Sequence, residues 1–368
     1  MKKVVHISTV HPAFDTRIFH KEAKTLVANG YRVTLIARKK YTEVVEGVRV
    51  AGLPEPENRM ARMLFLTRKA YQLADLEEGD IYHLHDPELL IYGLFLKLKG
   101  ARVIYDVHED VPKQIMGKDW IPRIMRKPAS FLAWVVEYVT SHMIDGTVAA
   151  TPTILERFPR HKTIMVQNFP LLEEFRMGKR FPYGERPKYV IYMGVISEER
   201  GIKEVIHALN LVGKDINVRL ILAGRFYPHY LRNDVANILG WEHVEYIGWQ
   251  DRENLADRLG NVRAGILTFH PLPNHVESQP TKLFEYMAAG LPVIVSDFPL
   301  WRRIIEETGC GILVNPLDPR EIAEAITWIM EHQEEAEAMG KRGQEAIKDK
   351  YNWESEATKL IEFYKAMS

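Results

Sequence analysis

Cysteine and long apolar runs are scarce in this chain. Cys310 is the one cysteine among 368 residues, which excludes a disulfide framework and is typical of a reducing compartment, so we expect a cytoplasmic protein. Because Cys310 lies between Gly309 and Gly311, before an apolar run, we interpret it as a small turn-and-strand residue, with a nucleophile as the alternative. No stretch approaches the roughly 20 apolar residues that cross a bilayer, and we expect no signal peptide after Met1.

An excess of charge of one sign is also lacking. The chain carries 49 Lys and Arg against 49 Asp and Glu. Residues 1–170 hold 25 basic and 19 acidic residues, whereas residues 171–368 hold 24 and 30. A modestly basic first half suits an anionic partner. It is too weak to indicate nucleic acid, and no motif of basic and aromatic residues that would read a base is present.

The sequence does contain a regular alternation of strands and helices. Strand patterns occur at Val4–Ser8, Arg32–Ala37, Val48–Ala51, Asp80–Leu84, Arg102–Val107 and Thr147–Ala150. The first helix is expected at Arg17–Asn29, where Gly30 ends it. Such an alternation predicts an α/β fold with a parallel sheet covered on both faces.

The alternation breaks at residues 171–187, which contain Gly and Pro without a clear period, and we interpret them as a linker. Strand patterns then return at Tyr189–Met193, Val218–Ala223, Val244–Ile247, Ala264–Thr268, Pro292–Val295 and Gly311–Val314. Helical patterns occur at Lys203–Leu211, Arg252–Leu259, Lys282–Ala289, Arg320–Glu331 and Glu334–Met367. We therefore expect two doubly wound domains, at 1–170 and 188–350, and a C-terminal helix at 351–368 that crosses back to the first.

Doubly wound sheets bind ligands beyond the carboxyl ends of their strands, where helix N-termini attract phosphate. The most informative such turn is HVESQPTKLFEYMAAG at 275–290. Lys282 lies in the first helical turn, where a cation opposes the helix dipole unless an anion such as a diphosphate binds there. Glu277 and Glu285 flank it and suit sugar hydroxyls, which need acceptors. The alternative is a surface loop before a core helix with an incidental lysine.

A second turn, YMGVISEERG at 192–201, places Arg200 before Gly201 and a helix. A guanidinium can clamp a phosphate with two hydrogen bonds. The alternative is a surface ion pair of Arg200 with Glu198 or Glu199.

Together these turns resemble those of the GT-B glycosyltransferases, specifically the retaining enzymes of family 4. The similar segments are GVISEERG at 194–201, ESQPTKLFEYMAAGLPVIVSD at 277–297 with its Glu-x7-Glu spacing, and GCGILVNPLDPREIAEAI at 309–326. The resemblance runs over essentially the whole chain and is strongest in 189–330. It implies two Rossmann-like domains that face each other across a cleft containing the active site.

The resemblance also implies roles for these residues. Glu285 would bind the ribose hydroxyls and Glu277 would contact the donor sugar. Arg200 and Lys282 would bind the diphosphate, and Gln250, in the turn YIGWQ, lies where family members contact the base.

The chain departs from the family pattern in its opening loop, where Ala13-Phe14 stands near the place of a usual Gly-Gly, and at three positions of the second half. Val195 stands where an arginine often follows the glycine of the first turn, and Ser278 and Pro280 replace glycines common in the Glu-x7-Glu element. One phosphate contact of the family is therefore missing, and Lys282 is the residue placed to compensate for it.

In the first half, HPAFDTRIFHKEAKTLVANGYRVTLIA at 11–37 resembles the opening strand, loop and helix of the family. Asp15 and Arg17 become candidates for binding the donor, and the alternative is an N-capping aspartate with a surface arginine. His108, in YDVHED at 105–110, falls where family 4 places a histidine near the donor sugar. We assign it to the active site, where it binds or polarises the sugar; alternatively, it closes a strand end through local hydrogen bonds.

The implied activity is a retaining transfer of sugar from a nucleotide diphosphate sugar to a saccharide or lipid-linked acceptor, in the synthesis of cell-envelope polysaccharide or glycolipid. No metal or other cofactor is expected, because Arg200, Lys282 and helix dipoles would stabilise the leaving group. The alternatives are a GT-B nucleotide-sugar epimerase, a non-catalytic nucleotide-binding module, and a metal-dependent hydrolase. In the hydrolase, His83 and His85 would bind one ion from one face of a strand.

Two first-half segments mix basic and large apolar residues, Arg59–Lys69 and Lys113–Trp134. Such segments can lie on anionic lipid, and the family often glycosylates lipid-linked or envelope saccharides. We therefore predict peripheral association with the inner face of a membrane. The alternative is that each forms an amphipathic helix packed on its own sheet.

Overall fold

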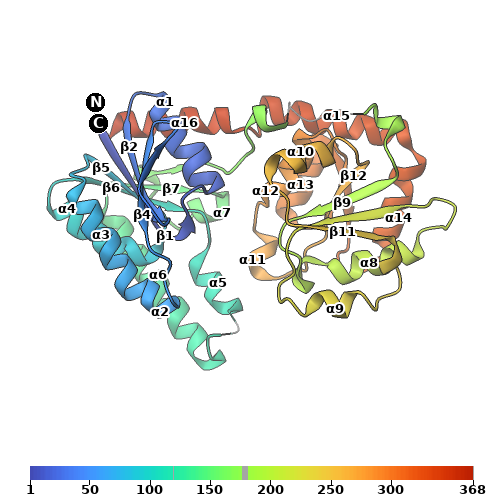
Figure 1. Cartoon of the computed structure of the whole chain (residues 1–368), viewed down its shortest axis with the longest axis horizontal. Coiled ribbons are helices and arrows are strands. Elements are labelled where there is room, and N and C mark those ends of the chain that lie inside the picture. The colour runs from blue at the N-terminus through green and yellow to red at the C-terminus, as the bar shows by residue number, and fades with distance from the viewer. Residues whose placement is uncertain (119, 176–180, 368) are drawn as a thin grey trace. The chain divides into compact units, whose positions relative to one another are not determined.

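The computed structural model describes residues 1–118, 120–175 and 181–367. The chain forms two compact units, the first made of Met1–Asn168 with Trp353–Ser368 and the second of Phe169–Asn352 (Figure 1). Residues 176–180 of the predicted linker, and Asp119 of the second predicted membrane segment, lie outside the described residues. Among the described residues, no helix combines the length and apolar character that crossing a bilayer requires.

The first unit contains an eight-stranded sheet in the order β3-β4-β2-β1-β5-β6-β7-β8. Its strands are β1 (Lys3–Pro12), β2 (Arg32–Arg38), β3 (Glu43–Val45), β4 (Val48–Leu53), β5 (Ile81–Leu84), β6 (Arg102–Val107), β7 (Gly146–Ala149) and β8 (Thr163–Met165). Neighbouring strands are parallel except β3 and β4. The predicted α/β class is confirmed, and the two strands that periodicity missed, β3 and β8, are only three residues long.

Helices cover both faces of this sheet. They are η1 (Thr16–Ala23), α1 (Lys24–Ala28), α2 (Arg59–Ala61), η2 (Arg62–Leu66), α3 (Thr67–Leu76), η3 (Pro87–Leu89), α4 (Leu90–Leu98), α5 (Val111–Gly117), α6 (Arg123–Met143), α7 (Pro152–Leu155), η4 (Arg160–Lys162) and α16 (Trp353–Ala366). The last helix packs against η1 and β8, and Trp353 Nε1 donates to Thr25 Oγ1 at 2.9 Å. The buried Trp353 and Tyr364 of α16 thus complete the first unit.

The second unit contains a six-stranded sheet in the order β11-β10-β9-β12-β13-β14, all parallel. Its strands are β9 (Tyr189–Met193), β10 (Arg219–Ala223), β11 (Val244–Gly248), β12 (Ala264–Leu267), β13 (Val293–Ser296) and β14 (Gly311–Val314). Its helices are η5 (Leu172–Phe175), η6 (Tyr183–Glu185), η7 (Glu198–Arg200), α8 (Ile202–Leu211), α9 (Leu231–Val235), η8 (Trp241–His243), α10 (Arg252–Leu259), α11 (Pro273–Val276), α12 (Thr281–Ala288), α13 (Pro299–Thr308), α14 (Pro319–Glu331) and α15 (Gln333–Asp349). The helix predicted over Glu334–Met367 is therefore two helices, because the chain leaves helical geometry between Asp349 and Trp353.

Each sheet has one point where the strand order reverses. In the first unit, β2, β4 and β3 lie beyond β1 on one side of the sheet, and β6, β7 and β8 lie beyond β5 on the other. In the second unit, β9 and β12 are the corresponding pair of central strands. Ligands of open α/β sheets bind beyond the carboxyl ends of such a strand pair. The turns after β1, β5, β9 and β12 are therefore where functional side chains are expected.

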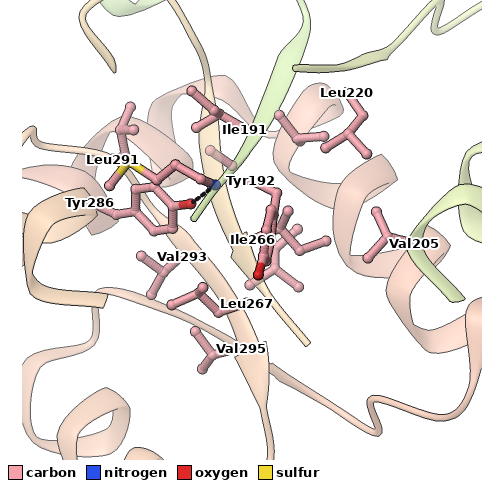
Figure 2. Packing of buried hydrophobic residues seen from close by; sticks show 14 of the residues in the cluster. Ile191, Tyr192, Val205, Leu220, Ile266, Leu267, Tyr286, Leu291, Val293 and Val295 are labelled. Carbon is pink, nitrogen blue, oxygen red and sulfur yellow. Dashed lines mark hydrogen bonds between the residues drawn. The ribbon is translucent and has the colours of Figure 1, made fainter. Parts of the chain in front are cut away.

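Tyr286 anchors α12 to the second of these points. Its ring is fully buried and lies against Gly265 of β12, where an added Cβ would be 2.2 Å from Tyr286 Cδ2. The Met193 N–H at the end of β9 donates to Tyr286 Oη at 3.0 Å, the dashed bond in Figure 2. Because Tyr286 contacts both strands, it sets the position of α12 at the reversal point.

Replacing Tyr286 with Phe removes the acceptor of the Met193 N–H while keeping the ring. An unsatisfied buried N–H costs about 1–3 kcal/mol, so we expect Tyr286→Phe to unfold at a lower urea concentration than the wild type. Tyr227→Phe is the matched control, because Tyr227 is 68% exposed. Equal urea midpoints for the two variants would contradict the anchoring role.

Candidate functional site

Two cations meet at the reversal point of the second unit. Gly194 follows β9 with a φ of 124°, which favours glycine. A Cβ built on Gly194 would lie 3.3 Å from Lys282 Cε and 3.6 Å from Arg200 Nη1. The structure therefore brings together the two residues that the sequence assigned to the diphosphate, one from the turn after β9 and one from the first turn of α12.

Neither cation forms an ion pair within the described part of the chain. Arg200 lies over the ring of Phe269, with its guanidinium carbon 5.1 Å from the centroid, and Lys282 Nζ is 3.5 Å from Thr281 Oγ1. The alternative from the sequence was a surface ion pair of Arg200 with Glu198 or Glu199, but Glu198 pairs with Lys203 at 2.7 Å. Two half-buried positive charges without a carboxylate partner favour an anion at this point.

The two glutamates lie on either side of Lys282 in the chain. Glu285 is half-buried one turn further along α12. Glu277 is half-buried at the end of α11, and the next residue, Ser278, accepts a hydrogen bond through its carbonyl from the buried Trp301 Nε1 at 2.7 Å. Trp301 thus fixes the loop that carries Glu277.

Gln250 is placed differently from the cations. It follows β11, which is separated from β9 by β10. Its side-chain amide donates to the Ile247 carbonyl at 2.7 Å. The amide is therefore hydrogen-bonded to β11, the strand that Gln250 follows.

At the reversal point of the first unit, His108 belongs to a chain of polar contacts. Its Nδ1 is 3.3 Å from Asp106 Oδ2 and its Nε2 is 3.0 Å from His11 Nε2. His11 Nδ1 in turn lies 3.5 Å from Asp15 Oδ2. Sequence reasoning missed His11, although it lies in β1, one of the two strands at which the order reverses.

Asp15 caps the first helix. Its side chain accepts from the N–H groups of Arg17 at 2.8 Å and Ile18 at 3.0 Å, so the capping alternative is confirmed. Burial acts to raise the pKa of Asp15, but the hydrogen bond with His11 and the two backbone N–H groups lower it overall. Asp15 is thus a carboxylate that orients His11.

Arg17 is not a surface residue, since it is only 3% exposed. It donates to both Asp106 oxygens at 2.8 and 2.7 Å and to the Val166 carbonyl at 3.0 Å, and its Nε is 3.0 Å from Glu22 Oε1. Burial acts to raise the pKa of Asp106, but Arg17 and the hydrogen bonds from His108 and His85 hold it well below its usual range. These contacts occupy the guanidinium of Arg17 inside the first unit. We therefore replace its expected role in donor binding with a positioning role, in which Arg17 holds Asp106 beside His108.

Two alternatives from the sequence lose support. His83 and His85 share a face as expected, but they are 0% and 2% exposed, and a hydrolytic metal needs a ligand position open to substrate. Cys310 is buried, and burial raises the pKa of its thiol to about 11. Because a nucleophilic thiol needs a lowered pKa, the structural interpretation of Cys310 stands.

The contact between His11 and Asp15 predicts a pH-dependent stability. Burial acts to lower the pKa of His11, but Asp15 and Asp86 raise it overall above 6.5. The folded state therefore gains stability from protonated His11 below pH 6.5 and loses it as the pH rises through the raised pKa. A double-mutant cycle of His11→Gln and Asp15→Asn, which keeps an N-cap acceptor, should give a larger coupling in urea unfolding at pH 5.5 than at pH 9. The same coupling at both pH values would contradict the ion pair.

Comparison with known proteins agrees with this architecture. Residues 176–346 match the family described as glycosyl transferases group 1, and residues 16–166 match the glycosyl transferase 4-like domain. The phosphatidyl-myo-inositol mannosyltransferase of Mycobacterium leprae (strain TN) is 24% identical over 368 residues, covering 94% of this chain and 91% of that protein. The D-rhamnosyltransferase WbpZ of Pseudomonas aeruginosa is 26% identical over 287 residues, covering 73% and 68%.

Solved structures are similar over the whole chain. Sucrose-phosphate synthase from Thermosynechococcus elongatus has a TM-score of 0.78 at 17% identity, covering 100% of this chain and 99% of that one. Anabaena HepE, solved in complex with UDP and glucose, has a TM-score of 0.76 at 14% identity, covering all of both chains. These likenesses show the GT-B fold. With both family matches spanning most of the sequence, the chain belongs to the GT-B glycosyltransferases of family 4 and is a transferase enzyme.

Proposed function

We propose that the protein is a retaining glycosyltransferase that moves a sugar from a nucleotide diphosphate sugar to a saccharide or lipid-linked acceptor. The observation that carries the proposal is the pair of cations, Arg200 and Lys282, without carboxylate partners beside Gly194. The relatives named as mannosyl- and rhamnosyltransferases and the neighbour solved with UDP and glucose agree with this class of donor.

The donor would bind at the start of α12. No described side chain caps this helix, whose N-cap is Pro280, so its first N–H groups remain for phosphate oxygens together with Lys282 and Arg200. Glu285 would accept hydrogen bonds from the ribose, and Glu277 from the donor sugar. Gln250 would contact the base through its backbone, since its side chain is hydrogen-bonded locally.

The reaction breaks the bond between the anomeric carbon and the diphosphate oxygen and forms a bond to the acceptor oxygen on the same face. The acceptor proton passes to the departing diphosphate, so no protein nucleophile is needed. Arg200, Lys282 and the helix start stabilise the charge that develops on the leaving group, which is why we expect transfer without a catalytic metal. His108, held by Asp106 and His11, would bind or polarise the donor sugar. An epimerase would instead need acid and base carboxylates around the sugar.

Removing either cation tests this function. We expect Arg200→Ala and Lys282→Ala to lower kcat by roughly 10²–10³, the usual effect of losing one donor to a developing anion. Lys203→Ala is the matched control, because Lys203 is already paired with Glu198.

The donor is first identified by thermal shift with UDP-, GDP-, ADP- and TDP-sugars, and products are compared with and without acceptor. Normal transfer by both alanine variants would refute the proposal, and a changed sugar without acceptor would indicate the epimerase.

We further propose that the first unit contacts an anionic bilayer. Exposed large side chains lie along both of the predicted membrane segments: Phe65 on η2, Trp120 between α5 and α6, and Ile124 and Phe131 on α6. Arg59 lies over Trp120, with its guanidinium carbon 4.5 Å from the ring centroid, so the two segments singled out in the sequence adjoin each other. Large apolar side chains flanked by exposed basic residues, among them Arg123 and Lys127, suit the interface of anionic lipid. Such a position would give access to a lipid-linked acceptor.

Vesicle flotation tests this contact. We expect the wild type to float with vesicles of phosphatidylcholine and phosphatidylglycerol and to float poorly with phosphatidylcholine alone. The variant Phe65→Ser with Trp120→Ser and Ile124→Ser should lose flotation, because it removes apolar area that enters the interface. Leu76→Ser with Leu98→Ser is the control, since both leucines are about as exposed but lie elsewhere on the unit. If the two variants floated equally well with the anionic vesicles, the proposed membrane-contact face would be ruled out.

A further inference from the structure

Three histidines and a glutamate converge inside the first unit. His6 in β1 and His83 in β5 are register partners in adjacent parallel strands, and His85 follows on the same face of β5. Glu22 approaches from η1. All four side chains are buried, with at most 2% of any residue exposed. Polar groups in such a position need partners, because burial without them is costly.

The ligand atoms of this cluster surround one carboxylate oxygen. Glu22 Oε2 is 4.0 Å from His6 Nδ1, 3.9 Å from His83 Nδ1 and 3.9 Å from His85 Nε2. His6 Nδ1 and His85 Nε2 are 2.9 Å apart. A tetrahedral site with metal–nitrogen bonds of about 2.0–2.1 Å places its ligand atoms about 3.4 Å from one another. The observed separations bracket that value.

The carboxylate of Glu22 is poorly satisfied. Glu22 Oε1 makes a 3.0 Å ion-pair contact with Arg17 Nε, but neither carboxyl oxygen has a hydrogen-bond partner in the described part of the chain, and the same holds for His6 Nε2 and His83 Nε2. The one cation beside it, Arg17, already makes a two-bond contact with Asp106. One guanidinium therefore stands between two buried carboxyl groups, so the Glu22 carboxyl needs either a proton or a second cation to balance its charge.

The surroundings orient His85 as they would around an ion, whereas His83 has a hydrogen bond that an ion would replace. His85 uses its other ring nitrogen, Nδ1, to contact Asp106 Oδ2 at 3.1 Å, and a carboxylate behind a ligating histidine is common at metal sites. Tyr364 Oη of α16 lies 2.8 Å from His83 Nδ1, so an ion at that nitrogen would displace this hydrogen bond. The cluster is also closed to solvent, as structural sites are.

We propose that His6, Glu22, His83 and His85 bind a divalent transition-metal ion, with Zn²⁺ the best match to three imidazoles and one carboxylate. The ion would compensate the charge of Glu22 and tie β1, β5 and η1 together behind the strand ends that carry His11 and His108. It is a structural ion, distinct from the sugar transfer proposed above, for which no metal is invoked. The competing occupant is a proton on Glu22.

The test uses the full chain, produced in zinc-replete and zinc-depleted medium and purified without a histidine tag or metal resin. We expect elemental analysis to find one zinc ion per chain from replete medium, and the unfolding temperature to fall when zinc is depleted. Glu22→Gln and His83→Gln should lose the ion, and His161→Gln, at an exposed histidine, should keep it. Production with Co²⁺ should give the visible absorption of a tetrahedral site in the wild type, a readout that does not depend on the variants folding.

Two results would overturn the proposal. A wild-type chain that contains neither zinc nor cobalt, and whose unfolding temperature is the same from both media, holds a proton in this cluster. Metal that persists in stably folded Glu22→Gln and His83→Gln lies at another place.

Discussion

In both sheets the long strands run parallel, so each turn from strand to helix reaches the same edge of its sheet. Residues far apart in sequence therefore meet at that edge. Arg200 and Lys282 come from the turns after β9 and β12 and meet at Gly194. His11 and His108 come from β1 and from the turn after β6, and their rings are in hydrogen-bond contact. The parallel connection of the strands thus determines which side chains can act together.

In the first unit, the Arg17–Asp106 pair lies behind the edge of the sheet that carries His108 and positions the side chains there. Asp106 accepts from Arg17 and contacts both His85 and His108. A buried pair of this kind is weak evidence for stability, because desolvation offsets the attraction, but losing one partner leaves an uncompensated charge. Its value here lies in orientation, because one carboxylate determines how two imidazoles are presented.

Strand positions could be predicted from the sequence because buried parallel strands are continuous apolar runs. Lys282 could be predicted because a lysine in a first helical turn is unfavourable without an anion, and Arg200 because it lies in a strand-to-helix turn. The burial of Arg17 could not, because its partner Asp106 lies 89 residues further along the chain. His11 has no sequence signal of its own either, because its contact with His108 depends on which strands are neighbours in the sheet. The sequence pattern over Glu334–Met367 is helical throughout, but the expected domain end at 350 and the separate C-terminal helix at 351–368 agree with the break between α15 and α16.

The C-terminal helix has a consequence for how the protein is made. Because α16 supplies buried Trp353 and Tyr364 to the first unit, that unit stays unfinished until the ribosome has added the whole of the second one. At about 5–20 residues per second, the delay is on the order of 10–40 s. During that interval Tyr364 is not yet present to contact His83, so the histidines that are buried in the mature protein lack part of their cover in the nascent chain.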